Sequence, residues 1–144
     1  MRKFGYTIVR GLFIVVCSVG AWLAARGWIE RLPDGYKSLA TGLVIVGSAA
    51  LLFSEVMLER TIKFEYEHHR GSWLDDDCPR VSFWRPDDHR ASYSAGKSVR
   101  WKLLFSTPKW AGVESSCVIW LRSYRIGWLV STCCFLTFLV LTFF

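Results

Sequence analysis

Three long apolar stretches constrain this chain of 144 residues more than any other feature of its sequence. They cover residues 4–25, 38–58 and 126–144. About 20 apolar residues in a helix, each adding about 1.5 Å, cross the roughly 30 Å hydrocarbon core of a bilayer. None of the stretches alternates polar and apolar residues as a barrel strand does. The sequence therefore predicts an all-α integral membrane protein with three transmembrane helices.

Two other interpretations of these stretches are weaker. In a soluble globule, the remaining 82 residues would have to cover all three stretches, which is too little chain for that task. A cleaved signal peptide is favoured by Arg2 and Lys3, but Arg10 interrupts the apolar run. Trp22 or Leu23 also stands where a small residue should precede the cleavage site. Cleavage would leave the second and third stretches as spans.

The basic residues set the expected orientation. Residues 59–125 hold 12 of the 18 Lys and Arg residues, and Arg2 and Lys3 begin the chain. Positively charged segments near spans stay on the cytoplasmic side. We expect a protein of a bacterial inner membrane, with a cytoplasmic N-terminus and a periplasmic Phe144. The expected parts are a helical hairpin over 1–58, a cytoplasmic loop over 59–125 and a third transmembrane helix over 126–144.

The predicted cytoplasmic loop begins as a continuation of the second helix. Leu58, Ile62 and Tyr66 form an apolar stripe at helical spacing. The helix is therefore expected to continue over residues 59–70 and to end at Gly71. Turn residues dominate 72–98. Thr107 and Pro108 have the types that begin a further helix, which would lead into the third span.

Residues 97–105 (KSVRWKLLF) predict a basic amphipathic helix with a tryptophan. Such helices lie in the headgroup region of an anionic leaflet, where lysine and arginine meet phosphate and tryptophan rings are partly buried. We therefore expect the loop to lie on the membrane surface with little core of its own. A solvent-exposed soluble module is the alternative. The expected contacts with lipid are Lys97, Arg100, Trp101, Lys102, Trp110, Trp120, Arg122, Arg125 and Trp128.

Catalytic and metal motifs are weak in this loop. Residues 91–98 (ASYSAGKS) resemble a loosened phosphate-binding loop, but no buried strand precedes them, so a flexible turn is the better interpretation. His68, His69, Cys78 and His89 are metal-competent but lack the close ligand pairs of a zinc site. We expect no metal, no cofactor and no enzymatic activity.

One pair of charges falls within the spans. Glu55 lies about one turn before the inner end of the second stretch, and Arg10 lies at a similar depth in the first. A charge at that depth costs a few kcal/mol unless it finds a partner or reaches the interface. An Arg10–Glu55 ion pair between the two helices is the leading interpretation. Separate snorkelling of the two side chains and a functional proton or ion site are the alternatives.

Small residues predict close helix packing in the spans. Gly42 and Gly47 lie on neighbouring stripes of the second stretch, and Gly127 and Ser131 are spaced for the same purpose on the third. They serve either packing within one chain or assembly of several chains.

The leading function class is a non-enzymatic accessory subunit that contacts anionic lipid headgroups and a membrane-protein partner or further copies of itself, without nucleic acid. The alternatives are a small oligomeric pore, transport or toxin-neutralising protein, and a membrane enzyme subunit that uses the histidines and aspartates of the loop.

Overall fold

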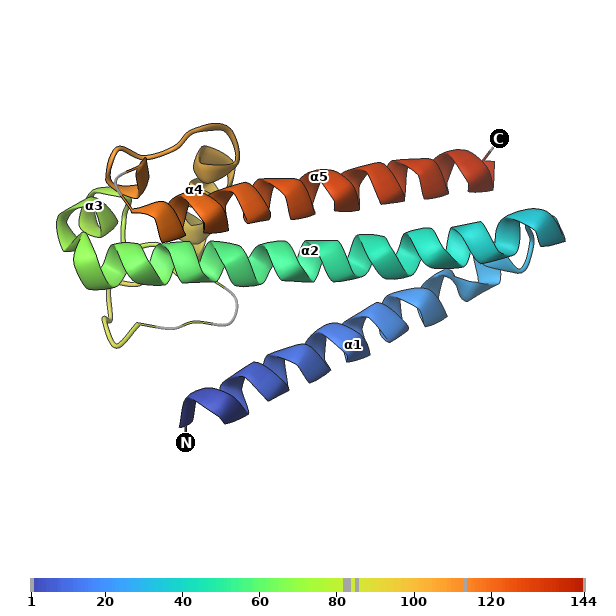
Figure 1. Ribbon diagram of the computed structural model, residues 1–144, viewed down its shortest axis with the longest axis horizontal. Coiled ribbons are helices and arrows are strands. Elements are labelled where there is room, and N and C mark those ends of the chain that lie inside the picture. The colour runs from blue at the N-terminus through green and yellow to red at the C-terminus, as the bar shows by residue number, and fades with distance from the viewer. Residues whose placement is uncertain (1, 82–83, 85, 113, 144) are drawn as a thin grey trace. The chain divides into compact units, whose positions relative to one another are not determined.

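The computed structural model describes residues 2–81, 84, 86–112 and 114–143, without the side chains of 2–11, 13 and 14 (Figure 1). Helices make up 81% of the chain, and the described residues form no strand. The prediction of an all-α fold is therefore confirmed. The elements are α1 (Arg2–Ile29), α2 (Asp34–His68), α3 (Arg70–Asp75), α4 (Tyr93–Phe105), the 3₁₀ helix η1 (Trp110–Gly112) and α5 (Ser115–Phe143).

Two helices, α2 and α5, are long and apolar enough to cross a membrane. The apolar part of α1 that the structure describes, Val15–Ile29, is shorter than a span requires. Length and composition thus support two of the three predicted spans.

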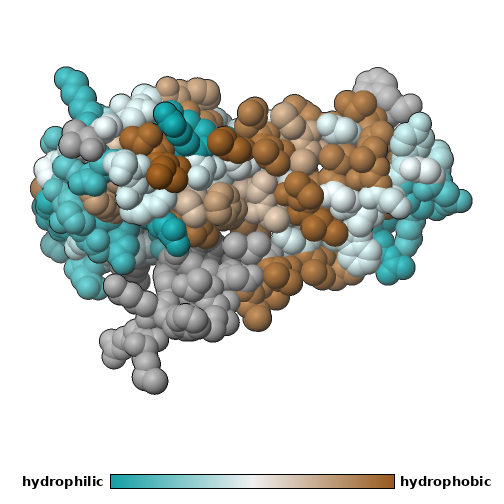
Figure 2. Space-filling view, viewed as in Figure 1, coloured by the Kyte–Doolittle hydropathy of each residue, from teal (hydrophilic) through white to brown (hydrophobic). Residues whose placement is uncertain are grey.

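The chain divides into two compact units, which we call unit 1 (Met1–Phe53 with Gly127–Phe144) and unit 2 (Ser54–Ile126). In unit 1, α1, the first part of α2 and the last part of α5 pack around Ile29, Ala40 and Val44. On the face drawn in Figure 2, apolar residues cover the middle of the described part of unit 1, and hydrophilic residues gather over unit 2 and at the turn between α1 and α2. The residues packed against the core of unit 1 are Ala21, Trp22, Ala25, Leu32 and Phe138.

Gly47 brings α2 and α5 together inside unit 1. A methyl group added to Gly47 would lie 3.0 Å from Cβ of Cys134 and 3.7 Å from the carbonyl oxygen of Ser131. The predicted role of Gly47 and Ser131 in close helix packing is confirmed. Gly42 has no such neighbour within 4 Å.

Unit 2 has a core of its own, so the expectation of little independent core is wrong. The ends of α2 and α5 that belong to this unit pack with α3, α4 and η1. The sequence pattern failed here because the core residues are contributed a few at a time by elements far apart in the sequence. They include Leu58, Ile62, Trp73, Val81, Val99, Leu103, Ala111, Cys117, Leu121 and Tyr124.

Several local predictions for unit 2 are corrected by the structure. The helix begun in the second span does continue, but α2 ends at His68, and Gly71 lies inside α3 rather than at a helix end. His69 breaks the helix with φ −130° and ψ 53°. The segment after α4 forms η1 rather than a helix begun by Thr107, and α5 starts only at Ser115.

Candidate functional site

The predicted basic helix exists as α4 and is longer than expected. Ser92 caps its start, because the Ser92 hydroxyl accepts a hydrogen bond from the backbone N–H of Ala95 at 3.4 Å. Residues 93–98 are therefore the first turns of a helix rather than a flexible turn. This also explains the phosphate-loop resemblance, since Ser92 caps the helix and Gly96 packs against the loop.

Gly96 lets a loop backbone cross α4 closely. A methyl group added to Gly96 would lie 2.0 Å from the carbonyl oxygen of Arg80, a distance that no side chain tolerates. The same loop is bonded to the start of α4, because the N–H of Ser92 donates to Cys78 O at 2.9 Å and the N–H of Arg80 donates to Ser92 O at 3.0 Å. The segment between α3 and α4 is thus fixed by backbone contacts.

An ion pair joins α4 to α2. Nη1 of Arg100 lies 2.7 Å from Oε1 of Glu55, and the two side chains are only 24% and 14% exposed. The Tyr124 hydroxyl of α5 donates to the carbonyl oxygen of Arg100 at 3.1 Å. The partner of Glu55 is therefore Arg100, a residue that the sequence assigned to lipid contact. The side chain of Arg10 lies outside the described residues, so the Arg10–Glu55 pair stays a prediction.

Arg125 binds the carbonyl groups at the C-terminal end of α4. Its guanidinium donates to the carbonyl oxygens of Leu103 at 3.1 Å and Ser106 at 2.7 Å, and to the hydroxyl of Thr107 at 3.0 Å. A cation at a helix C-terminus is favourable because the last carbonyl groups carry partial negative charge. Arg125 of α5 thus holds the end of α4 in place.

The remaining side of α4 is exposed and carries aromatic rings and lysines, and we call it the α4 outer face. Trp101 and Phe105 are 55% and 79% exposed, and their rings stack with centroids 6.4 Å apart. Lys97 lies over the ring of Tyr93 at 5.6 Å. Gly96, Val99 and Leu103 on the opposite side are buried. The outer face consists of Tyr93, Ser94, Lys97, Ser98, Trp101, Lys102 and Phe105.

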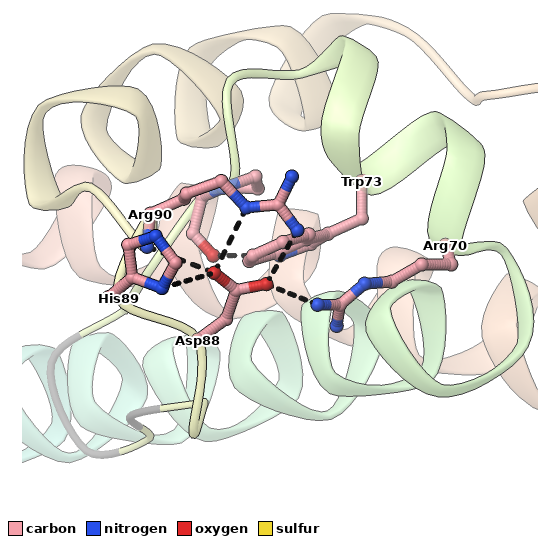
Figure 3. A network of polar contacts seen from close by, with 6 residues as sticks. Arg70, Trp73, Asp88, His89 and Arg90 are labelled. Carbon is pink, nitrogen blue, oxygen red and sulfur yellow. Dashed lines mark hydrogen bonds and ion pairs between the residues drawn. The ribbon is translucent and has the colours of Figure 1, made fainter.

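Asp88 anchors the loop between α3 and α4 to the start of α3 (Figure 3). Its side chain is 8% exposed and forms ion pairs with Arg70 and Arg90. The backbone N–H of Arg90 also donates to Oδ1 of Asp88 at 2.9 Å. Hydrogen bonds from the side chain and backbone of Arg90, with the charge of Arg70, lower the pKa of Asp88 to about 2. The carboxylate therefore stays ionised at any physiological pH.

Aromatic rings surround the Arg70 side of this network. The Arg70 guanidinium lies 4.0 Å from the ring centroid of Tyr66 and 4.5 Å from that of Trp73. The Trp73 indole is fully buried and donates from Nε1 to the carbonyl oxygen of Pro79 at 3.1 Å. The charge of Arg70 and the rings of Tyr66 and Trp73 thus contact one another within unit 2. Such an arrangement is typical of a structural anchor.

The metal-competent residues named from the sequence are not brought together. Among the described residues, no group of three or more His, Cys, Asp or Glu side chains is placed to hold a metal ion. His68 stacks on Phe64 with ring centroids 4.2 Å apart, His69 stacks on Trp110 at 5.3 Å, and Cys78 is buried. His89 is 94% exposed at 4.0 Å from Asp88.

The predicted lipid contacts divide into two groups. Lys97, Trp101 and Arg122 are exposed, and Trp128 is half-buried. The others are used within unit 2. Arg100, Lys102 and Arg125 bond to Glu55, Asp76 and helix carbonyls respectively. Trp110 and Trp120 pack near the ring of Phe64 at 6.4 and 6.2 Å.

Sequence reasoning did not assign Asp88, Gly96 or Glu65 the roles that the structure gives them. Glu65 is 1% exposed on α2, and a signal for its burial was present. It follows Leu58 by seven residues and Ile62 by three, so it lies on the apolar stripe of that helix. The roles of Asp88 and Gly96 could not be predicted from local pattern, because Arg70 and Arg80, which they contact, are distant in the sequence.

The chain matches no protein-family model, no curated protein and no solved structure. Its function must therefore be inferred from its own residues and contacts.

Proposed function

We propose that this chain is a small polytopic protein of a bacterial inner membrane and acts as a non-enzymatic accessory subunit. In this proposal the α4 outer face lies on the anionic surface of the bilayer, and a larger membrane protein is the partner. The observation that carries the proposal is the pairing of exposed aromatic rings with lysines on one side of a short helix whose other side is buried.

The exposed rings favour a lipid surface over water. Burying a large apolar side chain contributes about 1.5–3 kcal/mol relative to leaving it in water. Trp101 and Phe105 are largely exposed on the surface of unit 2, so burial within the protein stabilises them little. At the headgroup level their rings leave water while neighbouring polar groups stay hydrated.

The charges of α4 favour an anionic surface in particular. The helix has three basic residues and no acidic residue. Lys97 is exposed on the outer face, and a lysine near an anionic leaflet contributes about 1 kcal/mol. Anionic phospholipid is therefore the occupant that matches both the rings and the charge.

The helices of unit 1 supply the anchor in this proposal. α2 and α5 are the two candidate spans, and α1 is the third, with 28 residues in all. In a helix that length corresponds to about 42 Å, more than the roughly 30 Å hydrocarbon core. Ala21, Trp22 and Ala25 of α1 pack against the core of unit 1. The positive charge of residues 59–125 favours a cytoplasmic unit 2 and a periplasmic C-terminus.

Photocrosslinking in native membranes tests the proposal. Benzoylphenylalanine would replace Phe105, and in a control variant it would replace Leu74, an exposed apolar residue of α3 in the same unit. We expect adducts with phosphatidylglycerol at position 105 and several-fold fewer at position 74. Equal lipid adducts at both positions, or adducts only with protein at position 105, would contradict the lipid-facing role of α4.

A further inference from the structure

Glu65 is a buried carboxyl group in the middle of unit 2. It lies on α2, beyond the apolar stretch 38–58, and its side chain is 1% exposed. Among the described residues, no donor meets the distance and angle of a hydrogen bond to either carboxylate oxygen. A buried carboxylate without full hydrogen bonding is strongly disfavoured relative to the neutral acid.

The charged and polar groups around Glu65 come from several elements of the unit. Asp76, at the end of α3, and Lys102, on α4, act on it through their charges, and the indole N–H of Trp110 from η1 favours its ionised form. Just beyond the end of α2, His69 follows one turn later and stacks on Trp110 at 5.3 Å. Lys102 is already bonded to Asp76, whose side chain is 15% exposed.

We propose that Glu65 is a proton-binding site, and that its protonation state decides whether Lys102 is held by Asp76 alone or shared between Asp76 and Glu65. With Glu65 neutral, the Lys102–Asp76 pair ties α4 to the end of α3 without competition. When Glu65 loses its proton to water, the new negative charge repels Asp76 and attracts Lys102. The tie between α3 and α4 then loosens.

The expected range of this change is near neutral pH. Burial is the main cause that raises the pKa of Glu65, to about 7, and the charge of Asp76 adds to it, while Lys102 and Trp110 oppose it. The folded pKa is above the ordinary value of 4.5, so the folded protein holds the proton more tightly than the unfolded chain. The resulting stability is complete below about pH 4.5 and is lost as the pH rises through about 7.

A consequence for lipid binding rests on the proposed function, whereas the proton site does not. Lys102 belongs to the α4 outer face, so its release from Asp76 changes the charge that this face presents. The proton site can therefore be tested without reference to lipid.

Infrared difference spectroscopy of the full chain in nanodiscs tests the proton site directly. The carbonyl band of protonated carboxyl groups would be followed during a pH titration of the wild type, Glu65→Gln and Glu67→Gln. Glu67 is a matched control on the same helix, half-exposed and paired with Lys63. We expect a component that titrates near pH 7, is lost in Glu65→Gln and persists in Glu67→Gln.

Two variants that retain Glu65 keep the proposal falsifiable if Glu65→Gln does not fold. Asp76→Asn removes the repelling charge and frees Lys102, so the midpoint should move to lower pH. Lys102→Met removes the attracting charge, so the midpoint should move to higher pH. A carboxyl band that titrates only near 4.5, the ordinary pKa of a glutamate, would overturn the proposal, and so would a midpoint that neither variant moves.

Discussion

In unit 1 hydroxyl groups bond within their own helix, whereas in unit 2 several polar side chains also join residues far apart in the sequence. In unit 1 the hydroxyls of Ser48, Thr132 and Thr137 each donate to the carbonyl oxygen four residues earlier in the same helix. In unit 2 the bonds Arg100–Glu55, Lys102–Asp76 and Tyr124–Arg100 join residues 45, 26 and 24 positions apart.

The proposed membrane location of unit 1 accounts for this difference. A helix in lipid must satisfy its polar groups within itself or within its bundle, because no water is present. Its contacts with other helices then depend on shape, as at Gly47. Polar side chains in contact with water are free to link elements. In unit 2 such links, among them the Arg70–Asp88 ion pair, hold the segment between α3 and α4. Substitutions at four places in the chain test this difference between the units.

The largest effect is expected at Gly96. Gly96→Ala places a methyl group 2.0 Å from the Arg80 carbonyl oxygen, which belongs to backbone and cannot move cheaply. We expect unit 2 to lose about 3 kcal/mol or more, the upper range for overpacking. Gly71→Ala is the matched control, since no atom lies within 4 Å and alanine favours a helix by about 0.5–1 kcal/mol. Denaturant unfolding in detergent measures both, and equal stabilities would show that the loop does not cross α4 as described.

The Glu55–Arg100 pair should have the next largest effect. Arg100→Met leaves Glu55 without its partner in unit 2, and we expect a loss of about 2–3 kcal/mol for this largely buried pair. Reversing both charges, as Glu55→Arg with Arg100→Glu, should recover part of the stability that either single change removes.

The same reversal with Arg10→Glu in place of Arg100→Glu tests the pair predicted from sequence. Recovery with Arg100 and not with Arg10 would identify Arg100 as the partner of Glu55. Recovery with Arg10 alone would contradict the assignment of Glu55 to Arg100.

A shape change in unit 1 should cost less. Gly47→Ala requires Cys134, with its Cβ 3.0 Å from the added methyl group, to give way by a few tenths of an ångström. We expect a loss of about 1 kcal/mol. Gly42→Ala serves as the control because nothing lies within 4 Å of its added methyl group. Thermal unfolding of both variants in the same micelles separates packing from helix propensity, and a larger loss for Gly42→Ala would reverse the assignment of packing faces.

The smallest of the four effects, and the one that depends on pH, concerns Asp88. Its folded pKa of about 2 lies below the ordinary value of 3.8, so its contribution to stability is present above pH 3.8 and is lost as the pH falls through about 2. Asp88→Asn should lower the unfolding temperature at pH 7, with a deficit that shrinks between about pH 4 and about pH 2. A deficit independent of pH in that range would mean that the charge of Asp88 does not hold the loop.

What the sequence could predict followed from local pattern. The continuation of the second helix past Leu58, the helix over 97–105 and the close packing at Gly47 each depend on spacing within one segment. The core of unit 2 could not be predicted in this way, because its contacts join residues far apart. Arg100 illustrates the limit, since its type and spacing fit a lipid contact equally well until the position of Glu55 is known.

Glu65 shows that a local signal can also be present and go unused. It lies on the apolar stripe with Leu58 and Ile62, and a carboxyl group at such a position is either buried or marks the edge of the stripe. Only the packing of α3, α4 and η1 around it distinguishes the two cases.

Depth measurement of nitroxide labels in nanodiscs tests the central claim, which is that unit 1 lies in lipid and that the α4 outer face lies on the surface of the bilayer. A genetically encoded nitroxide amino acid leaves the five cysteines in place and would be introduced at Leu136, Phe105 and Leu74 in turn. All three side chains are exposed. We predict that accessibility to oxygen relative to a water-soluble nickel chelate is highest at Leu136, intermediate at Phe105 and lowest at Leu74. Equal ratios at Leu136 and Leu74 would contradict membrane insertion, and equal ratios at Phe105 and Leu74 would contradict the lipid-facing role of α4.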